Sequence, residues 1–235
     1  MLYLVATPIG NLEDITARAA RILSSVDIVL AEDTRTSRIL LSHLGSERRM
    51  HPFHDFNKEH RTPWVIEQLE AGRSVALISD AGTPGIADPA FYLVRAARNA
   101  AIPVSALPGP CAAIAALVCS GLPVDRFIFD GFLPARPGKR KKALAGYHHE
   151  TRTVIVYESP HRILRTLADM EEVLGCFQVV IAREMTKLHE EFLCGSAAWL
   201  RAHFETIPPR GEMVVVFNTT VPASTAERQT ATSCT

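Results

Sequence analysis

Short continuous hydrophobic runs alternate along the chain with longer stretches in which apolar residues recur at helical spacing. The short runs predict β-strands at Leu2–Thr7, Asp27–Glu32, Val75–Asp80, Pro103–Leu107, Phe127–Phe132, Thr153–Glu158, Val179–Glu184 and Met213–Phe217. The helical patterns lie between them, at Thr16–Leu23, Arg38–Leu44, Trp64–Ala71, Ala90–Asn99, Ala112–Ser120 and Ile163–Leu174. This alternation is typical of an α/β architecture in which helices cover sheets of largely parallel strands.

A break in the middle of the chain predicts two domains. Gly121-Leu122-Pro123 follows a helical pattern and precedes a new strand, and Gly and Pro are the residues that end helices. We therefore expect an N-terminal α/β domain over residues 1–121 and a C-terminal α/β domain over residues 122–218. Residues 219–235 are rich in Ser, Thr and Ala and poor in large apolar side chains, which predicts a disordered tail.

The composition narrows the class of protein. Apolar residues make up 47% of the 235 residues and charged residues 21%, as in soluble globular proteins. Lys+Arg and Asp+Glu both number 25, so any nucleic-acid surface must be a local patch. The 5 cysteines are dispersed without a C-x-x-C pair, which favours a reducing compartment. With no signal-peptide pattern and no membrane-length apolar run, we expect a cytoplasmic protein.

Glycine, proline and charged residues concentrate in loops that directly follow predicted strands. These loops are Ala6–Asn11, Ala31–Arg35, Ser79–Gly85 and Pro108–Ala113. Because the carboxyl ends of parallel strands share one edge of a sheet, we expect the loops to converge on a single cleft. Ordinary strand-to-helix turns also use Gly and Pro, but the accompanying Asp, Glu and Arg residues favour a binding site.

The loop from Ser79 to Gly85 has the strongest pattern. Gly82 and Gly85 allow the backbone to approach a ligand closely, and Asp80 can accept hydrogen bonds at the strand end. The chain lacks both the G-x-G-x-x-G and the G-x-x-x-x-G-K-[ST] patterns, so the usual dinucleotide and nucleoside-triphosphate signatures are absent. Pro110 predicts a helix start with free N–H groups, either an ordinary one or one aimed at the cleft.

Several segments together resemble one known family. They are "ATPIGNLEDIT", "AEDTRTS", "SDAGTPGIADP", "PGPCAA", "YESPHR" and "AREMTK", and they are similar to the tetrapyrrole-methylase superfamily of S-adenosylmethionine (SAM)-dependent methyltransferases. The resemblance runs in order from Leu2 to Phe217. It implies a two-domain α/β fold, with a mostly parallel sheet in the N-terminal half and a mixed sheet with helices in the C-terminal half. It also implies SAM held between the domains and a homodimer. Methyl transfer from a sulfonium to oxygen is an in-line displacement that needs no metal, so we expect none.

Within this superfamily the segments are most similar to the branch that methylates small-subunit (16S) ribosomal RNA on the ribose 2′-hydroxyl of a cytidine. The small ribosomal subunit is then the implied partner. The resemblance also implies a set of cofactor contacts from both halves of the chain. These are Pro8, Asp80, Gly82, Asp88, Ala112, Ala113, Phe132, Tyr157, Ala182 and Glu212.

Transfer of a methyl group to a hydroxyl requires alignment of the two reactants and removal of a proton. Alignment can supply roughly 7–11 kcal/mol, and a general base typically contributes about 10²–10⁴-fold. Carboxylates and cations cluster in Glu32-Asp33-Thr34-Arg35 and in Arg183-Glu184-Met185-Thr186-Lys187. We expect the catalytic set to be Asp33, Arg35, Glu184 and Lys187, without assigning the base. A salt-bridge network at the strand ends is the alternative.

A basic segment precedes one of the helical patterns in the C-terminal half. Its cations are Arg136, Lys139, Arg140, Lys141 and Lys142. Such a cluster predicts contacts to RNA phosphates, whereas a solvated loop that leads into a helix is the structural alternative.

Two other functions remain open at this point. One is a methyltransferase of the same superfamily that acts on a tetrapyrrole-like small molecule. The other is a non-catalytic SAM- or RNA-binding module used in ribosome assembly. The basic segment and the "AEDTR" sequence favour the RNA methyltransferase over the small-molecule enzyme, whereas release of S-adenosylhomocysteine would distinguish an enzyme from the module.

Overall fold

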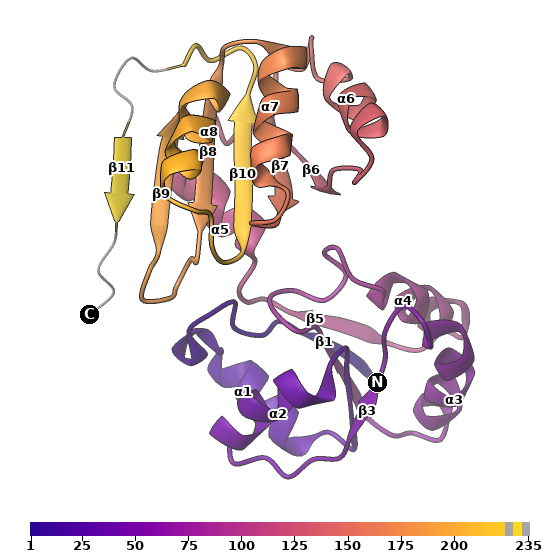
Figure 1. Ribbon diagram of the computed structural model, residues 1–235. Coiled ribbons are helices and arrows are strands. Elements are labelled where there is room, and N and C mark those ends of the chain that lie inside the picture. The colour runs from indigo at the N-terminus through magenta and orange to yellow at the C-terminus, as the bar shows by residue number, and fades with distance from the viewer. Residues whose placement is uncertain (224–227, 232–235) are drawn as a thin grey trace. The chain divides into compact units, whose positions relative to one another are not determined.

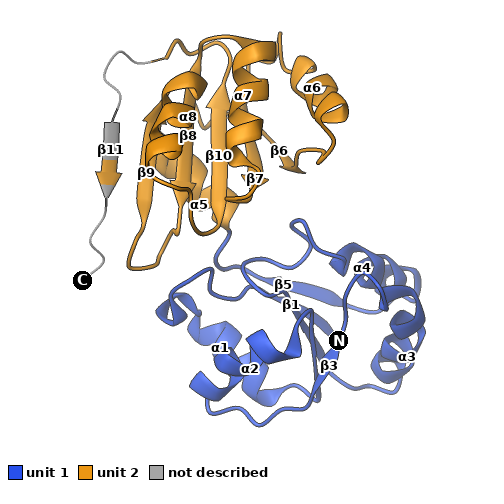
Figure 2. Ribbon diagram, in the orientation of Figure 1, with its two compact units in different colours: residues 1–111 blue, residues 112–235 orange. Residues whose placement is uncertain are grey.

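The computed structural model describes residues 1–223 and 228–231 and divides into two compact units (Figures 1 and 2). Unit 1 is Met1–Cys111 and unit 2 is Ala112–Thr235. The division lies before helix α5 (Ala112–Cys119), whereas the sequence pattern predicts it after that helix, at Gly121. The reason is tertiary packing, because α5 contacts strands β7 and β10 of unit 2.

Unit 1 is built on a five-stranded sheet in which every neighbouring pair is parallel. The strands are β1 (Leu2–Val5), β2 (Ile28–Ala31), β3 (Met50–Pro52), β4 (Val75–Ile78) and β5 (Val104–Leu107). Their order is β3-β2-β4-β1-β5. The predicted parallel sheet in the N-terminal half is confirmed. The hydrophobic pattern missed β3 because this edge strand is only three residues long and is not continuously apolar.

Helices cover both faces of this sheet. They are the 3₁₀ turn η1 (Leu12–Asp14), α1 (Ala17–Ser25), α2 (Thr34–His43), α3 (Lys58–Glu70) and α4 (Ala90–Asn99). Successive residues of β4 serve opposite cores, because side chains alternate along a strand. Val75 and Leu77 join the core that contains residues of α3 and α4, while Ala76 and Ile78 join the core with residues of α1 and α2. Burial on both faces explains the continuously apolar run.

Unit 2 contains a six-stranded mixed sheet of order β11-β9-β8-β10-β7-β6. The strands are β6 (Phe127–Phe132), β7 (Thr153–Glu158), β8 (Gln178–Arg183), β9 (Glu191–Gly195), β10 (Met213–Asn218) and β11 (Arg228–Ala231). Among the pairings of the described strands of unit 2, only β6–β7 is parallel. The predicted mixed sheet is confirmed, although β9 and β11 were not predicted.

The helices of unit 2 are α5, α6 (Pro137–Ala145), α7 (Ile163–Leu174) and α8 (Ala197–Thr206). Figure 1 shows α7 and α8 side by side over one face of the sheet, and residues of both join its main hydrophobic core. Leu167 of α7 and Leu200 of α8 are completely buried there, against strand residues such as Val215.

The end of the chain differs from the sequence prediction. Residues Arg228–Ala231, part of the segment expected to be disordered, form β11 and pair antiparallel with β9. Residues 224–227 and 232–235 of that segment lie outside the described residues. Within the part of the chain that the structure describes, no helix is both long and apolar enough to cross a bilayer.

Candidate active site

Hydrogen bonds join the loops that follow the strands of unit 1. Thr7, after β1, and Gly82, after β4, exchange two backbone hydrogen bonds with N···O distances of 2.9 and 3.0 Å. Thr83 Oγ1 donates to the carbonyl of Pro110, after β5, at 2.9 Å. The backbone N–H of Asp33, after β2, donates to Asp80 Oδ1 at 2.9 Å. The predicted convergence of the four loops is therefore confirmed.

Two glycines make this convergence possible. Gly82 has φ +80°, a conformation that side-chain-bearing residues rarely adopt. Gly109 has no such backbone requirement, but a Cβ atom added there would lie 2.8 Å from Ala6 Cβ. The loops after β1 and β5 thus approach so closely that only glycine fits between them.

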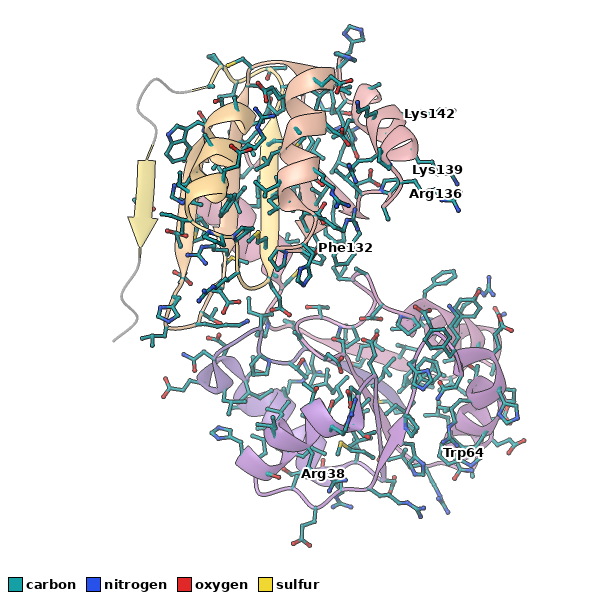
Figure 3. The ribbon with its side chains drawn as sticks, in the orientation of Figure 1. Arg38, Trp64, Phe132, Arg136, Lys139 and Lys142 are labelled. Atoms are coloured by element: carbon teal, nitrogen blue, oxygen red, sulfur yellow. The ribbon has the colours of Figure 1, made fainter. Side chains whose placement is uncertain are left out.

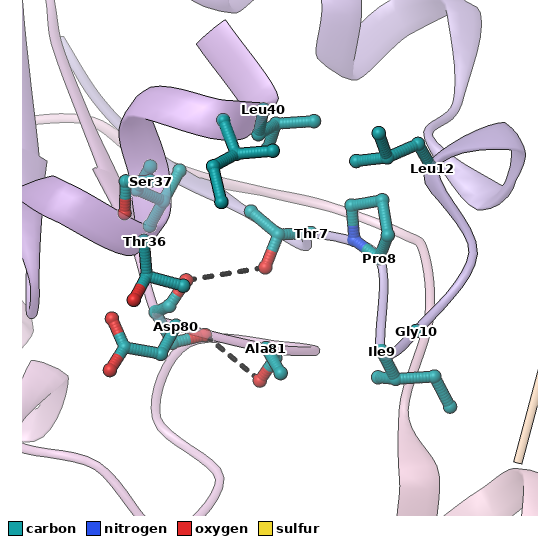
Figure 4. Close-up of a pocket in the computed structure, with 13 residues that line it drawn as sticks. Thr7, Pro8, Ile9, Gly10, Leu12, Thr36, Ser37, Leu40, Asp80 and Ala81 are labelled. Carbon is teal, nitrogen blue, oxygen red and sulfur yellow. Dashed lines mark hydrogen bonds between the residues drawn. The ribbon is translucent and has the colours of Figure 1, made fainter. Parts of the chain in front are cut away.

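A pocket of about 220 Å³ opens beside these loops, entirely within unit 1 (Figure 4). Its walls come from the loop after β1, from helix α2, and from the end of β4 with its following loop. The lining residues are Thr7, Pro8, Ile9, Gly10, Leu12, Thr36, Ser37, Ile39, Leu40, Ile78, Ser79, Asp80 and Ala81. Two residues that the family resemblance assigns to the cofactor, Pro8 and Asp80, are among them.

Asp33 and Arg35 form a closed ion pair at the start of α2. Asp33 is the N-cap, and its Oδ1 accepts the backbone N–H of Arg35 at 2.8 Å. The Arg35 guanidinium donates to both carboxylate oxygens, at 3.2 and 2.9 Å. These hydrogen bonds lower the pKa of Asp33 to about 2. Asp33 is therefore a very weak base, and its partner Arg35 remains exposed to solvent.

The neighbouring carboxylate, Glu32, has the opposite electrostatics. Burial raises its pKa above the ordinary value, and the negative charges of Asp80, Asp88 and Asp55 raise it further. A carboxylate in this state is a better proton acceptor than Asp33. The excess of negative charge also suits a cationic ligand, which would supply the missing counter-charge. Glu32 belongs to the predicted cluster but not to the predicted catalytic set; its position directly after a buried strand was the available signal.

The Asp88 carboxylate makes its hydrogen bonds within its own loop. Its carboxylate accepts the backbone N–H groups of Gly85 and Ala90, each at 2.8 Å, and so holds the start of α4. Burial nevertheless raises its pKa. These hydrogen bonds fix the end of the loop that carries Asp80 and Gly82.

The second predicted cluster forms an ion-pair network in unit 2. Lys187 Nζ lies 3.0 Å from Glu184 Oε1 and 3.2 Å from Glu212 Oε2. The backbone N–H of Glu212 donates to Glu184 Oε1 at 3.2 Å, and Glu184 N–H donates back to the Glu212 carbonyl at 3.1 Å. The structure thus brings together two predicted catalytic residues and one predicted cofactor residue.

This network rests on an unusual backbone. Glu184 and Thr186 have φ of +49° and +65°, which cost free energy for residues other than glycine. Gly211, with φ +77°, lies against the Glu184 carboxylate so closely that a Cβ atom would collide with it. Strain of this kind persists only where surrounding contacts hold it, and it concentrates at functional sites.

The network keeps both partners charged. Burial opposes the ionised form of Glu184, but hydrogen bonds from Lys187 and from the Glu212 backbone lower its pKa overall. Burial likewise opposes the protonated form of Lys187, but its two carboxylate partners raise its pKa overall. Lys187 is therefore a fixed cation, suited to stabilise a developing alkoxide or to bind a phosphate, and is unsuited to act as a base.

The other predicted cofactor residues of unit 2 differ in accessibility. Phe132 on β6 is 56% exposed and meets the ring of Tyr157 on β7 edge-on, with centroids 5.6 Å apart. Ala112 and Ala113 form the first turn of α5. Ala182 is fully buried in β8 between β9 and β10, so its side chain has no free surface.

The basic segment forms helix α6, and its five cations are not equivalent. Arg140 is 2% exposed and donates to Asp169 Oδ2 from Nε at 2.7 Å. Lys141 is bound to Glu172, with Nζ 2.6 Å from Oε2. The prediction of five phosphate-binding cations is corrected here, because two of them hold α6 onto α7. Figure 3 shows the remaining three, Arg136, Lys139 and Lys142, at the surface of the helix.

Comparison with known proteins places the chain in a family. Residues 1–201 match the family model described as Tetrapyrrole (Corrin/Porphyrin) Methylases. A relative from Pasteurella multocida, named Ribosomal RNA small subunit methyltransferase I, is 49% identical over 97% of this chain and 82% of its own length. A Thermotoga maritima relative of the same name is 44% identical over 92% of this chain and 97% of its own length.

Solved structures show the same fold at low sequence identity. Diphthine synthase superposes with a TM-score of 0.71 at 15% identity, covering 94% of this chain and 90% of its own. Uroporphyrin-III-C-methyltransferase from Thermus thermophilus gives a TM-score of 0.62 at 22% identity, covering 93% and 94%. The fold, the family model and the relatives agree: this chain belongs to the tetrapyrrole (corrin/porphyrin) methylase family.

Proposed function

We propose that this chain is a SAM-dependent methyltransferase that methylates small-subunit (16S) ribosomal RNA on the ribose 2′-hydroxyl of a cytidine. The observation that carries the proposal is the high identity, over almost the whole chain and both units, to relatives named Ribosomal RNA small subunit methyltransferase I. By contrast, the solved tetrapyrrole methyltransferase resembles the chain only in fold, at 22% identity. That favours RNA over a tetrapyrrole-like small molecule.

The cofactor would supply an activated methyl group on a positively charged sulfur. In unit 1 we assign Pro8, Asp80 and Gly82 to its binding, with Asp88 shaping the loop. Burial raises the pKa of Glu32 and nearby carboxylates raise it further, and this excess of negative charge supports a cationic ligand at this edge of the sheet. In unit 2 the proposed contacts are Ala112, Ala113, Phe132, Tyr157, the backbone of Ala182, and Glu212.

The protein residues must orient the ribose and manage the proton of its 2′-hydroxyl. We propose that Lys187, held by Glu184, stabilises the oxygen as it loses the proton. Arg35, whose guanidinium is exposed, binds an adjacent RNA phosphate while Asp33 positions it. Glu32 joins the predicted set as a candidate proton acceptor because its pKa is raised.

The RNA surface that we propose on unit 2 is the exposed side of α6, with Arg136, Lys139 and Lys142. These cations would contact phosphates without reading the sequence. We further propose that the protein acts in the cytoplasm on the small ribosomal subunit and works as a homodimer, as the family resemblance implies.

The test is methyl transfer from radiolabelled SAM to small ribosomal subunits isolated from cells that lack this modification. We expect incorporation into 16S RNA, release of S-adenosylhomocysteine, and recovery of 2′-O-methylcytidine after nuclease digestion. Incorporation into a tetrapyrrole in a parallel reaction, with none into RNA, would identify the small-molecule alternative. Binding of SAM without release of S-adenosylhomocysteine under either condition would identify a non-catalytic module.

A further inference from the structure

The residues that line the pocket of unit 1 make it unsuitable for an anionic ligand. Leu12, Ile39, Leu40 and Ile78 give it largely apolar walls. None of the 13 lining residues, all within the described segment 7–81, is Lys, Arg or His. A phosphate or carboxylate would therefore enter without a counter-charge, at high desolvation cost.

One polar group in this lining has no partner. Ser37 is only 4% exposed, and its Oγ is buried without a hydrogen-bond partner among the described residues. The other buried hydroxyls of the lining are satisfied, because Thr7 and Ser79 donate to backbone carbonyls at the end of β4. A buried hydroxyl without a partner costs free energy, and native proteins rarely keep one without a reason. A ligand in the pocket would provide the missing partner.

The size and position of the pocket restrict that ligand further. Its volume of about 220 Å³ is below the roughly 300–1,000 Å³ of sites that hold whole drug-sized molecules. It therefore suits a single ring. Figure 4 shows Thr36, Ser37 and Leu40 across the pocket from Pro8 and Leu12. Pro8 and Asp80 are also proposed cofactor contacts, and a methyl acceptor must lie within a few ångströms of the donor.

We propose that this pocket receives the pyrimidine base of the nucleotide to be methylated, turned out of its RNA stack. Enzymes that modify a single nucleotide commonly extrude it into a pocket and hold the base by apolar contact and edge hydrogen bonds. Here the apolar walls pack against the ring, and Ser37 Oγ makes a hydrogen bond with the polar edge of the base. The proposal rests on the RNA methyltransferase function proposed above and names the place where its substrate is recognised.

Two variants with a matched control test this assignment. Ser37→Ala keeps Cβ and removes only the hydroxyl, and Thr36→Phe narrows the pocket from an exposed position in the first turn of α2. Ser42→Ala is the control, because Ser42 is an exposed serine of the same helix that does not line the pocket. For each protein we would measure kcat/KM for unmethylated small ribosomal subunits, the Kd for SAM by calorimetry, and Tm.

For Ser37→Ala we expect kcat/KM to fall about ten- to hundredfold, SAM affinity to change less than about twofold, and Tm to stay the same or rise. The unchanged or higher Tm follows because an unpartnered buried hydroxyl is removed. Thr36→Phe should lose transfer almost completely and retain SAM binding, and Ser42→Ala should behave like the unsubstituted protein. A purely structural role for Ser37 would instead lower Tm together with activity.

Three results would overturn the proposal. Unchanged kcat/KM in Ser37→Ala and Thr36→Phe would show that the base does not enter the pocket. A loss of SAM affinity of tenfold or more in both variants would assign the pocket to the cofactor. If the unsubstituted protein binds SAM but transfers no methyl group to ribosomal subunits, the proposed function fails and this inference fails with it.

Discussion

The two predicted catalytic clusters differ in how their partly buried charges are balanced. At the end of β2 in unit 1, Glu32 lies among other carboxylates, and its pKa is raised. After β8 in unit 2, Glu184 and Lys187 neutralise one another on a strained backbone. An acidic site that lacks counter-charge favours the binding of a cationic ligand. In an ion pair that is already neutralised, by contrast, the partners hold each other's side chains in a fixed orientation. We therefore propose that the first cluster captures the cationic ligand and that the second orients a cation for the transfer step.

The largest effect is expected from removing the cation of unit 2. Lys187→Ala should lower kcat for methyl transfer by about 10²–10³-fold, the usual effect of removing one preorganised stabilising group. SAM affinity should change little, because the cofactor would be captured mainly by the acidic edge of unit 1. Single-turnover transfer and calorimetry on the same preparation would separate these quantities.

Lys187→Arg serves as the control, because it keeps the charge while altering the hydrogen-bond geometry to Glu184 and Glu212. Partial activity in Lys187→Arg, with almost none in Lys187→Ala, would support a stabilising cation. Wild-type kcat in Lys187→Ala would reduce the cluster to a structural ion pair.

A second test concerns the strain that holds the cluster. Gly211→Ala should destabilise unit 2 by about 1–3 kcal/mol, from the positive φ together with displacement of the Glu184 side chain. Gly121→Ala is a control within unit 2, because Gly121 has φ +71° but nothing within 4 Å of an added Cβ. A larger loss of unfolding free energy in urea for Gly211→Ala than for Gly121→Ala is the effect expected from the collision with Glu184. Equal losses would show that the close approach of Gly211 to Glu184 has no energetic importance.

The same contrast between paired and unpaired charge occurs within α6. Replacing Arg136, Lys139 and Lys142 with Gln should weaken binding to small ribosomal subunits about tenfold at moderate salt and reduce the salt dependence of binding. Lys141→Gln should leave the salt dependence unchanged, since Lys141 is already paired with Glu172. Filter binding from low to high salt would measure both. An unchanged slope in the triple variant would rule out phosphate contacts on this helix.

The hydrophobic pattern was sufficient to predict most of the framework. The bounds of β6, β7, α4 and α7 agree with their predicted ranges, which came from short apolar runs for the two strands and from helical spacing for the two helices. The pattern missed the strands β3, β9 and β11, whose stability comes from pairing with neighbouring strands more than from their own composition. It also missed the helices α6 and α8. It also misplaced the boundary between the units, because the packing of α5 onto β7 and β10 is a tertiary contact that its sequence does not record.

At the candidate sites, the sequence located the clusters of charged residues but could not assign a role to each residue within a cluster. Asp33 and Glu32 are adjacent and both acidic, yet the Arg35 ion pair lowers the pKa of one while burial raises that of the other. Likewise, the sequence does not distinguish Arg140 from the other cations of the basic segment. Only the structure shows that it pairs with Asp169, which is distant in sequence. Ser37 ends the "AEDTRTS" segment but was given no role, because only the three-dimensional structure shows that its hydroxyl lacks a partner.

The smallest predicted effect concerns pH and tests the acidic side of the comparison directly. A bound sulfonium would favour ionised Glu32, whose pKa in the free protein is raised, so SAM binding should weaken as pH falls from neutral through that pKa. We expect the Kd to rise several-fold over that fall in pH, and Glu32→Gln to flatten this dependence. Asp33→Asn should leave the dependence intact, because a carboxyl with a pKa of about 2 does not titrate in this range. If calorimetry shows the same pH dependence of the Kd in the unsubstituted protein and in Glu32→Gln, the carboxylate that interacts with the sulfonium is a different residue. The raised pKa of Glu32 then needs an explanation other than cofactor binding.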